Sequence, residues 1–319
     1  SVASAYIRPR MVQSNLTVML NACVEKVLFT GKRATGVRLR QHYQLVEVFV
    51  RHEVVLSLGA INTPKVLMLS VIGDAALLSD QGIGLVQHLP GVGRNFQDHI
   101  LVAGCCWEYP EPQAPRNNSA EFTFFTKSDP ALITPDLQPV LEERAFGSEI
   151  TRSQYQLPVD PSLAWTLAPG LVRPHSRGQV LLTGNRFIDP VRIEANFLSD
   201  ERDVKALLKG IELCREIGSS APLKPFVKRE LMPGRLSSAD MLEFLRSAAG
   251  TYFHQTCTAK MGIDALSVVD GRLRVYGIEG LRIADGSIMP EITTGNTMAP
   301  CMLIGKRAAD MIRLDIGLS

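Results

Sequence analysis

The stretch LRIADGSIMPEITTGNTMAPCMLIG (residues 281–305) joins a short apolar run, an Asp-Gly-Ser turn and a Gly-Asn-Thr turn, and it leads into a predicted helix. The apolar residues of APCMLIGKRAADMIRL (299–314) predict that helix, and Pro300 near its start suits the first turn. Upstream, YFHQTCTAKMG (252–262) places His254 in a Thr-rich segment. The two segments together contain either ordinary packing residues or one half of an active site.

Each polar residue here also has a purely structural interpretation. His254 could be a buried histidine that bonds to backbone, which is at least as common as a catalytic one. Asn296 could be the N-cap of the helix, and Asp285 could form an Asx-turn with Gly286. Their joint order favours a site, because a helix start attracts negative charge such as that of a reduced flavin. A neutral histidine beside it can accept a hydroxyl proton, and an amide can hold the developing alkoxide.

Composition limits the class of protein. The chain has 319 residues, 45% of them hydrophobic and 21% charged, with a net charge of +2, which suits one large or two moderate domains and argues against nucleic-acid binding. No apolar run is long enough to span a membrane. Six cysteines without metal-ligand spacing predict no metal site, and they favour a reducing, cytoplasmic setting. The chain starts at Ser1, inside a pattern that already alternates like a strand, so we expect a fragment of a longer protein.

The order of predicted elements suggests a discontinuous first domain. Residues 16–56 read as strands, from LTVML through a turn at Gly31 to VEVFVRHEVVLSL. A helix should follow, with Thr63 as its N-cap and Pro64 at its first position.

The middle of the chain has a different character. Residues 100–175 alternate short strands with Pro-rich loops, and helices are predicted at about 200–217 and from Ser238. We therefore expect α/β structure (α+β overall), with a first domain made of residues 1–99 and 250–319 and a second domain, 100–249, inserted between them.

Four stretches then resemble one family, the glucose–methanol–choline (GMC) family of FAD-dependent oxidoreductases. They are GAINTPKVLMLSVIG (59–73), LPGVGRNFQDH (89–99), HQTCTAKMG (254–262) and the long run from Val268 to Ile312. The resemblance implies a partial FAD-binding Rossmann-like domain with an antiparallel-sheet substrate domain. It also implies an alcohol dehydrogenase or oxidase, similar to choline dehydrogenase, that passes hydride from a CH–OH group to flavin N5.

The resemblance also implies roles for individual residues. His254 matches the catalytic base and Asn296 the second active-site position. The positions implied to contact FAD are Val24 at the adenine, Asp285 and Gly286 along the pyrophosphate and ribityl chain, Thr297 and Met298 at the ring edge, and Phe253. Phe122, Phe124 and Phe125 are expected to shape the substrate pocket, or else to fill the sheet core.

The chain also departs from the family pattern. Val71 and Cys257 stand where the family has glycine, and we interpret Cys257 as a packing residue. No GxGxxG unit, which would hold the FAD pyrophosphate, occurs in the chain. Two alternatives therefore stay open: a non-catalytic or partner-dependent fragment, and a flavin-retaining lyase relative. The expected partner is a small-molecule alcohol, with a homo-oligomer possible. Oxygen, a quinone and other carriers are all open as electron acceptor.

Overall fold

The computed structural model describes residues 2–116, 118–120 and 122–317. Over this part of the chain the helices are α1 (Gly59–Leu69), α2 (Ala75–Asp80), α3 (Glu149–Gln154), α4 (Glu201–Gly218), α5 (Ser238–Ala248) and α6 (Met298–Asp315). Shorter helical turns are η1 (Ala3–Ile7), η2 (Arg8–Arg10), η3 (Pro161–Leu163), η4 (Ala221–Phe226) and η5 (Gly286–Ile288). The strands are β1 (Ala22–Thr30), β2 (Arg33–Gln41), β3 (Gln44–Phe49), β4 (Val54–Leu56), β5 (Ile72–Gly73), β6 (Gln87–His88), β7 (Arg94–Phe96), β8 (Ile100–Val102), β9 (Cys106–Glu108), β10 (Phe122–Thr123), β11 (Val140–Glu142), β12 (Ala164–Ala168), β13 (Gly170–Leu171), β14 (Gly178–Leu182), β15 (Val191–Glu194), β16 (Arg229–Met232), β17 (Ala249–Thr251) and β18 (Leu281–Ile283).

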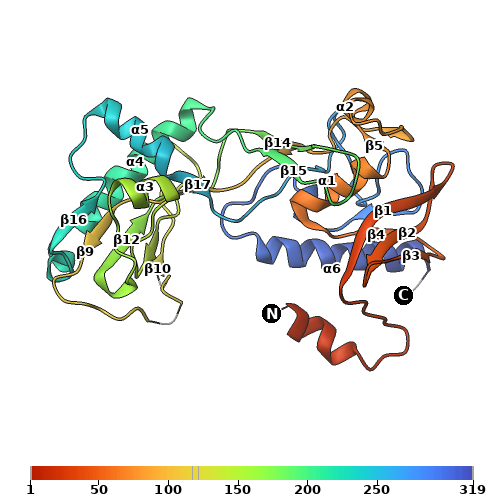
Figure 1. Ribbon diagram of the computed structural model, residues 1–319, viewed down its shortest axis with the longest axis horizontal. Coiled ribbons are helices and arrows are strands. Elements are labelled where there is room, and N and C mark those ends of the chain that lie inside the picture. Colours follow the sequence, from red (N-terminus) through yellow and green to blue (C-terminus); the bar gives the residue numbers. More distant parts are fainter. Residues whose placement is uncertain (1, 117, 121, 318–319) are drawn as a thin grey trace.

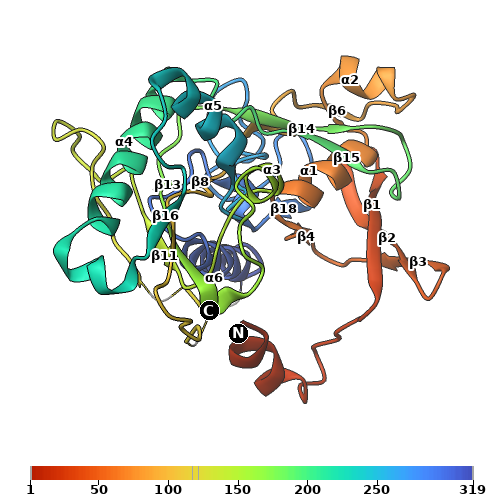
Figure 2. The same cartoon turned by 60° about the vertical axis from the view of Figure 1, so that its left-hand side comes forward.

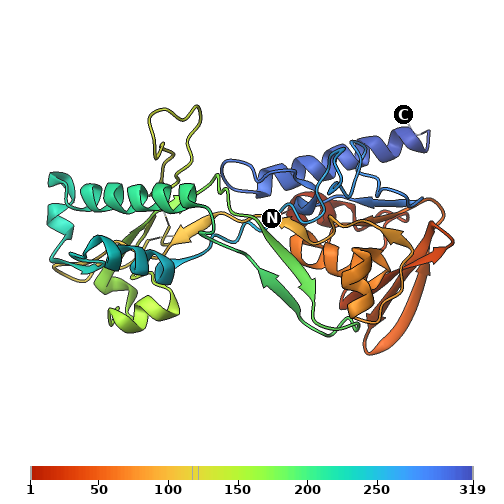
Figure 3. The same cartoon turned by 90° about the horizontal axis from the view of Figure 1, so that it is seen from above.

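These elements form two lobes that lie side by side (Figure 1). The first lobe contains α1, α2, α6 and the strands β1 to β6, and the second contains α3, α4, α5 and the sheet of β9 to β12 with β16. Figure 2 shows α6 almost end-on, and Figure 3 shows the β14–β15 hairpin reaching from the middle of the molecule to the first lobe. The predicted mixture of helices with antiparallel sheets is confirmed.

Each lobe has its own hydrophobic core. Apart from partly buried Leu182, the first core draws on residues 24–92 and 259–311, and the second draws on residues 100–249. The predicted boundaries at 1–99, 100–249 and 250–319 stay a prediction, which the composition of the two cores supports. None of the helices in the described part of the chain combines the length and apolar composition that a bilayer crossing requires.

The sheet of the second lobe has the strand order β10-β11-β12-β9-β16, with every neighbouring pair antiparallel. Trp165 lies directly opposite Trp107, and the two rings stack with centroids 4.5 Å apart. Such cross-strand aromatic pairs stabilise sheets. Gly218, at the end of α4, lacks a Cβ where one would collide with the Trp107 ring, so α4 can pack closely on this sheet.

The two predicted helices of the second lobe are confirmed. At the start of α4, Asp200 Oδ1 accepts a hydrogen bond from Arg202 N, and buried Leu207, Ile211 and Cys214 share one face. Ser237 caps α5 in the same way by accepting from Asp240 N. Local signals were sufficient to place both helices.

The predicted start of α1 is wrong. The helix begins at Gly59, whose φ of +78° favours glycine, so Thr63 and Pro64 lie inside it. Thr63 Oγ1 instead accepts from Leu58 N (3.1 Å) and donates to Asp285 Oδ2 (2.6 Å). Pro64 cannot donate to the carbonyl of Ala60, and that carbonyl accepts from Thr258 Oγ1 at 2.6 Å. A partner from a distant segment therefore allows the helix to continue through a proline.

The predicted strand in LTVML (16–20) is also wrong, because β1 begins only at Ala22. Ala22 pairs with Gln41 at the far end of β2, so residues before Ala22 have no strand opposite them. Leu20 is accordingly 70% exposed. The turn at Gly31 between β1 and β2 is confirmed, with a φ of +57°.

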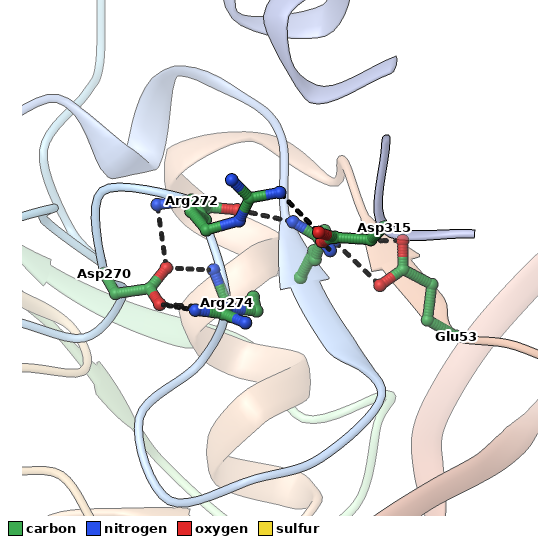
Figure 4. Close-up of polar contacts among 6 residues, drawn as sticks. Glu53, Asp270, Arg272, Arg274 and Asp315 are labelled. Carbon is green, nitrogen blue, oxygen red and sulfur yellow. Dashed lines mark hydrogen bonds and ion pairs between the residues drawn. The ribbon is translucent and has the colours of Figure 1, made fainter. Parts of the chain in front are cut away.

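A cluster of charged residues bonds the end of α6 to the rest of the first lobe (Figure 4). The Arg282 side chain is only 3% exposed, and its Nε donates to Glu53 at 2.7 Å. Asp315, the last residue of α6, pairs with both Arg282 and Arg272. Because Arg282 lies on β18 and Leu281 pairs in parallel with Val54 of β4, this cluster fixes α6 against the β4–β18 pair.

Candidate active site

The loop at residues 89–99 joins the two segments that contain the predicted site. Gln97 and Thr256 exchange backbone hydrogen bonds of 3.3 and 2.9 Å. Asn95 Nδ2 donates to Pro290 O at 3.0 Å, and Gln97 Oε1 accepts from Ile292 N at 3.2 Å. The polar side chains of this loop therefore hold the His254 segment beside the segment that leads to Asn296.

Asp98 fixes the backbone at His254. Its Oδ1 accepts from His254 N at 2.8 Å, and its Oδ2 accepts from Thr251 Oγ1 and from Gln255 Nε2. Burial raises the pKa of the Asp98 carboxyl to about 6, although the hydrogen bond from Thr251 opposes this shift. The turn after β17 therefore has a fixed geometry, which holds the backbone of His254 in place.

His99, the next residue, contacts the ring of His254. The two Nδ1 atoms are 3.0 Å apart, and His99 Nε2 lies 3.0 Å from the carbonyl oxygen of Thr293. Burial, followed by the charge of His254, lowers the pKa of His99 to about 4. Burial also lowers the pKa of His254, so both rings are neutral at pH 7.

Tyr252 and Asn296 complete the surroundings of His254. The Tyr252 ring lies 5.2 Å from the His254 ring, and a Cβ on Gly170 would lie only 2.6 Å from Tyr252 Cε1. Asn296 Nδ2 is 3.4 Å from His254 Nε2, while Asn296 Oδ1 is 3.5 Å from Gln138 Nε2. The structure thus brings the two predicted catalytic residues, His254 and Asn296, within hydrogen-bonding distance.

The start of α6 lies next to this pair. Thr297 is its N-cap, and within the described residues its side chain makes no capping hydrogen bond, so Asn296 is not the N-cap. Phe253 and Met298 are 75% and 67% exposed. Two exposed apolar side chains and a helix start without a side-chain cap fit the ring end of a flavin, which is planar, largely apolar and negative when reduced.

Two other predicted cofactor residues, Asp285 and Gly286, lie beside the segment that follows His254, because Gly286 O accepts from Cys257 N at 3.1 Å. Asp285 forms the predicted Asx-turn by accepting from Ser287 N at 2.8 Å, and its second oxygen accepts from Gly59 N and Thr63. Both oxygens of the Asp285 carboxylate therefore accept hydrogen bonds from other groups of the protein, next to Gly286. Val24 borders a bulge in β1, where the pairing with β2 shifts register.

Of the three predicted pocket phenylalanines, only Phe125 lies near Asn296. A Cβ on Gly295 would be 3.4 Å from the Phe125 ring. Phe122 and Phe124 line a different cavity of about 800 Å³. That cavity includes Trp165 and Leu167, which point to the α4 side of the sheet, whereas Ala168 packs with Tyr252 on the opposite side.

Sequence reasoning missed the roles of Asp98, His99, Tyr252 and Gln138. The loop that ends in Asp98 and His99 was singled out, but their partners lie about 155 residues away, at His254. Cys257 has a φ of +74° and is fully buried, and burial raises the pKa of its thiol to about 12. A neutral, enclosed thiol suits the predicted packing role. Among the described residues, no group of His, Cys, Asp and Glu is arranged to hold a metal.

Known proteins resemble this chain in sequence and in fold. Sequence models of GMC oxidoreductases match residues 1–101 and 174–305. The chain belongs to the GMC oxidoreductase family. This GMC chain is 36% identical over 98% of its length to an uncharacterized GMC-type oxidoreductase of Mycobacterium tuberculosis. It is 35% identical, again over 98% of its length, to the oxygen-dependent choline dehydrogenase of Pseudomonas fluorescens.

The GMC fold is also seen in solved structures. Pyridoxine 4-oxidase from Mesorbium loti superposes on 97% of this chain with a TM-score of 0.92 and 30% sequence identity. The chain covers 61% of that structure, 62% of the mycobacterial relative and 59% of the choline dehydrogenase. The GMC chain therefore spans about three fifths of the length of these relatives.

Proposed function

We propose that this chain forms the substrate-oxidising part of an FAD-dependent GMC oxidoreductase that acts on the CH–OH group of an alcohol. The observation that carries the proposal is the pairing of His254 Nε2 with Asn296 Nδ2, 3.4 Å apart, at the start of α6. Family membership and the named relatives support the reaction class.

His254 is proposed as the base. Burial lowers the pKa of His254, so the ring is neutral at pH 7 and can accept a proton from a substrate hydroxyl. Asn296 is proposed to bind the same substrate hydroxyl as His254, because its amide can donate a hydrogen bond to the substrate oxygen as negative charge develops there. Tyr252, in contact with His254, excludes water from one side of the ring.

The residues at the start of α6 are proposed to hold the cofactor ring. Phe253, Thr297 and Met298 would contact its edge, and Asp285, Gly286 and Val24 would contact the rest of FAD through backbone groups. When bound, FAD supplies the acceptor for the hydride that the alcohol carbon loses. The described residues include no glycine-rich loop that could bind the pyrophosphate. The residues named here therefore suit the flavin ring of FAD and the atoms next to it.

A flavin-binding assay tests the proposal. The chain is incubated with excess FAD and desalted, and its absorbance is recorded anaerobically before and after addition of an alcohol. Choline and pyridoxine, which appear in the relatives' names, are the first alcohols to add. Bleaching by either alcohol in the parent and in His175→Ala, but not in His254→Ala, is expected. Equal bleaching in His254→Ala would overturn the role of His254.

A second candidate is that the chain binds flavin only together with another polypeptide segment. Of the 18 residues of α6 only Ala308 is buried, and Leu303 and Leu314 are 61% and 71% exposed, so α6 leaves apolar surface uncovered. In that case the desalted chain retains no flavin, whereas addition of a protein that carries a GxGxxG unit restores retention.

A further inference from the structure

We propose that His99 is a positioning residue that holds His254 in one tautomer, with hydrogen on Nδ1 and the acceptor lone pair on Nε2. The inference rests on the proposed function of His254 as the base. It adds a second histidine, outside the two predicted catalytic positions, to the machinery of the site.

The Thr293 carbonyl determines the tautomer of His99. A carbonyl oxygen can only accept a hydrogen bond, so His99 Nε2, 3.0 Å away, must carry hydrogen and donate it. A neutral imidazole has one protonated nitrogen, which leaves His99 Nδ1 as an acceptor. His254 Nδ1, 3.0 Å from it, must then be the donor.

The opposite arrangement leaves buried groups unsatisfied. If His254 Nδ1 accepted, neutral His99 would donate from Nδ1 and point the lone pair of Nε2 at the Thr293 oxygen. A doubly protonated His99 would satisfy both partners, but its ring is fully buried beside His254 and Tyr252. The hydrogen bonds of the Asp98 carboxylate go to His254 N, Thr251 and Gln255, and those of the His99 ring go to His254 and Thr293, so a charged His99 ring would have no carboxylate bonded to it.

The consequence for His254 is that Nε2 is ready to accept a proton. Nε2 faces Asn296 Nδ2, which is where a substrate hydroxyl would lie. When Nε2 gains a proton, the Nδ1 hydrogen stays bonded to His99, so the ring does not have to reorient. In a Ser-His-Asp triad, the aspartate accepts a hydrogen bond from Nδ1–H of the histidine and so fixes its tautomer and orientation. The neutral ring of His99 has the same role toward His254.

Nitrogen NMR of the flavin-free, 319-residue chain tests the proposal. With ¹⁵N-labelled histidine, two-bond ¹H–¹⁵N correlations distinguish hydrogen on Nδ1 from hydrogen on Nε2. His88 is an internal reference for the opposite tautomer, because its Nδ1 accepts from Ala75 N at 3.2 Å. We expect the Nδ1–H pattern for His254 and the Nε2–H pattern for His88 in one spectrum at pH 7.5. An Nε2–H pattern for His254 would overturn the proposal.

Two variants of His99 separate positioning from packing. His99→Leu removes the acceptor, so the His254 signals should move toward the Nε2–H pattern while those of His88 stay in place. His99→Asp accepts but cannot donate from its ionised form, so it should keep the Nδ1–H pattern and raise the pKa of His254. An unchanged His254 pattern in His99→Leu would contradict the proposal. If His99→Leu does not fold, the parent spectrum still decides, because it contains both tautomers.

These measurements are independent of the proposed reaction. If the chain shows the predicted tautomer but no alcohol bleaches its flavin, the proposed function fails and the positioning by His99 stands. If an alcohol bleaches the flavin but His254 carries hydrogen on Nε2, the proposed function stands and the positioning fails.

Discussion

Replacement of Thr258 by valine should destabilise the first lobe through a single hydrogen bond. Thr258 is fully buried, and its hydroxyl is 2.6 Å from the Ala60 carbonyl, which receives no helical hydrogen bond from Pro64. Valine has nearly the same shape but leaves that carbonyl without a donor. A buried acceptor left without a partner costs about 1–3 kcal/mol, which is the loss we expect in the free energy of unfolding.

A double-mutant cycle with Pro64→Ala isolates this effect. Alanine at position 64 supplies an N–H that can donate to the Ala60 carbonyl within α1, so Thr258→Val should cost about 1–2 kcal/mol less in that background. Urea unfolding followed by circular dichroism measures the four free energies. Thr258→Ser, which keeps the hydroxyl and loses one methyl group, is the control and should cost about 1 kcal/mol. Equal costs of Thr258→Val in both backgrounds would refute the reasoning.

Four further predictions use the same unfolding measurement. Cys257→Gly should be more stable than Cys257→Ala by about 1 kcal/mol, because both lose the thiol and only alanine is strained at a φ of +74°; equal stabilities would contradict this. Val71 has a φ of +64° just after α1, so Val71→Gly should stabilise the chain by about 0.5–1 kcal/mol, and a loss of stability would argue against strain there. Arg282→Met should cost about 3 kcal/mol, since it leaves Glu53 unpaired, whereas Arg38→Met at a more exposed pair should cost less than about 1 kcal/mol; similar costs would refute the distinction. Folding lowers the pKa of His99 from 6.5 to about 4, so the stability from neutral His99 is present above pH 6.5 and lost as the pH falls to 4. The penalty for His99→Leu should therefore shrink by about 3 kcal/mol between pH 6.5 and pH 4, and a constant penalty would disprove it.

The sequence was sufficient where local signals decide the structure. The helices α4 and α5 have an acidic or serine cap followed by apolar residues at helical spacing, and both were predicted close to their true bounds. The pairing of His254 with Asn296 was also anticipated, from the order of these residues along the chain together with the family resemblance. Periodicity cannot show that two loops 42 residues apart meet.

The errors occurred where a distant partner overrides the local preference. Thr63 and Pro64 form a typical helix start, yet α1 begins at Gly59, five residues before Pro64, and Asp285 bonds both Gly59 N and Thr63. LTVML alternates like a strand, but no strand lies opposite it. The role of His99 was not foreseen, because the tautomer depends on a backbone carbonyl at Thr293 that no side-chain motif encodes.

The β4–β18 pair has a consequence for how the protein is made. Ser57 and Ala284, which are bonded beside this pair, are 227 residues apart in the sequence. At a synthesis rate of about 5–20 residues per second, β4 waits roughly 10–45 s for its partner strand to be made. The whole second lobe is translated during that interval and can fold on its own contacts. Until β18 arrives, the apolar residues of β4 and α1 lack part of their packing, so a chaperone that covers exposed apolar segments would find its binding site on the nascent first lobe.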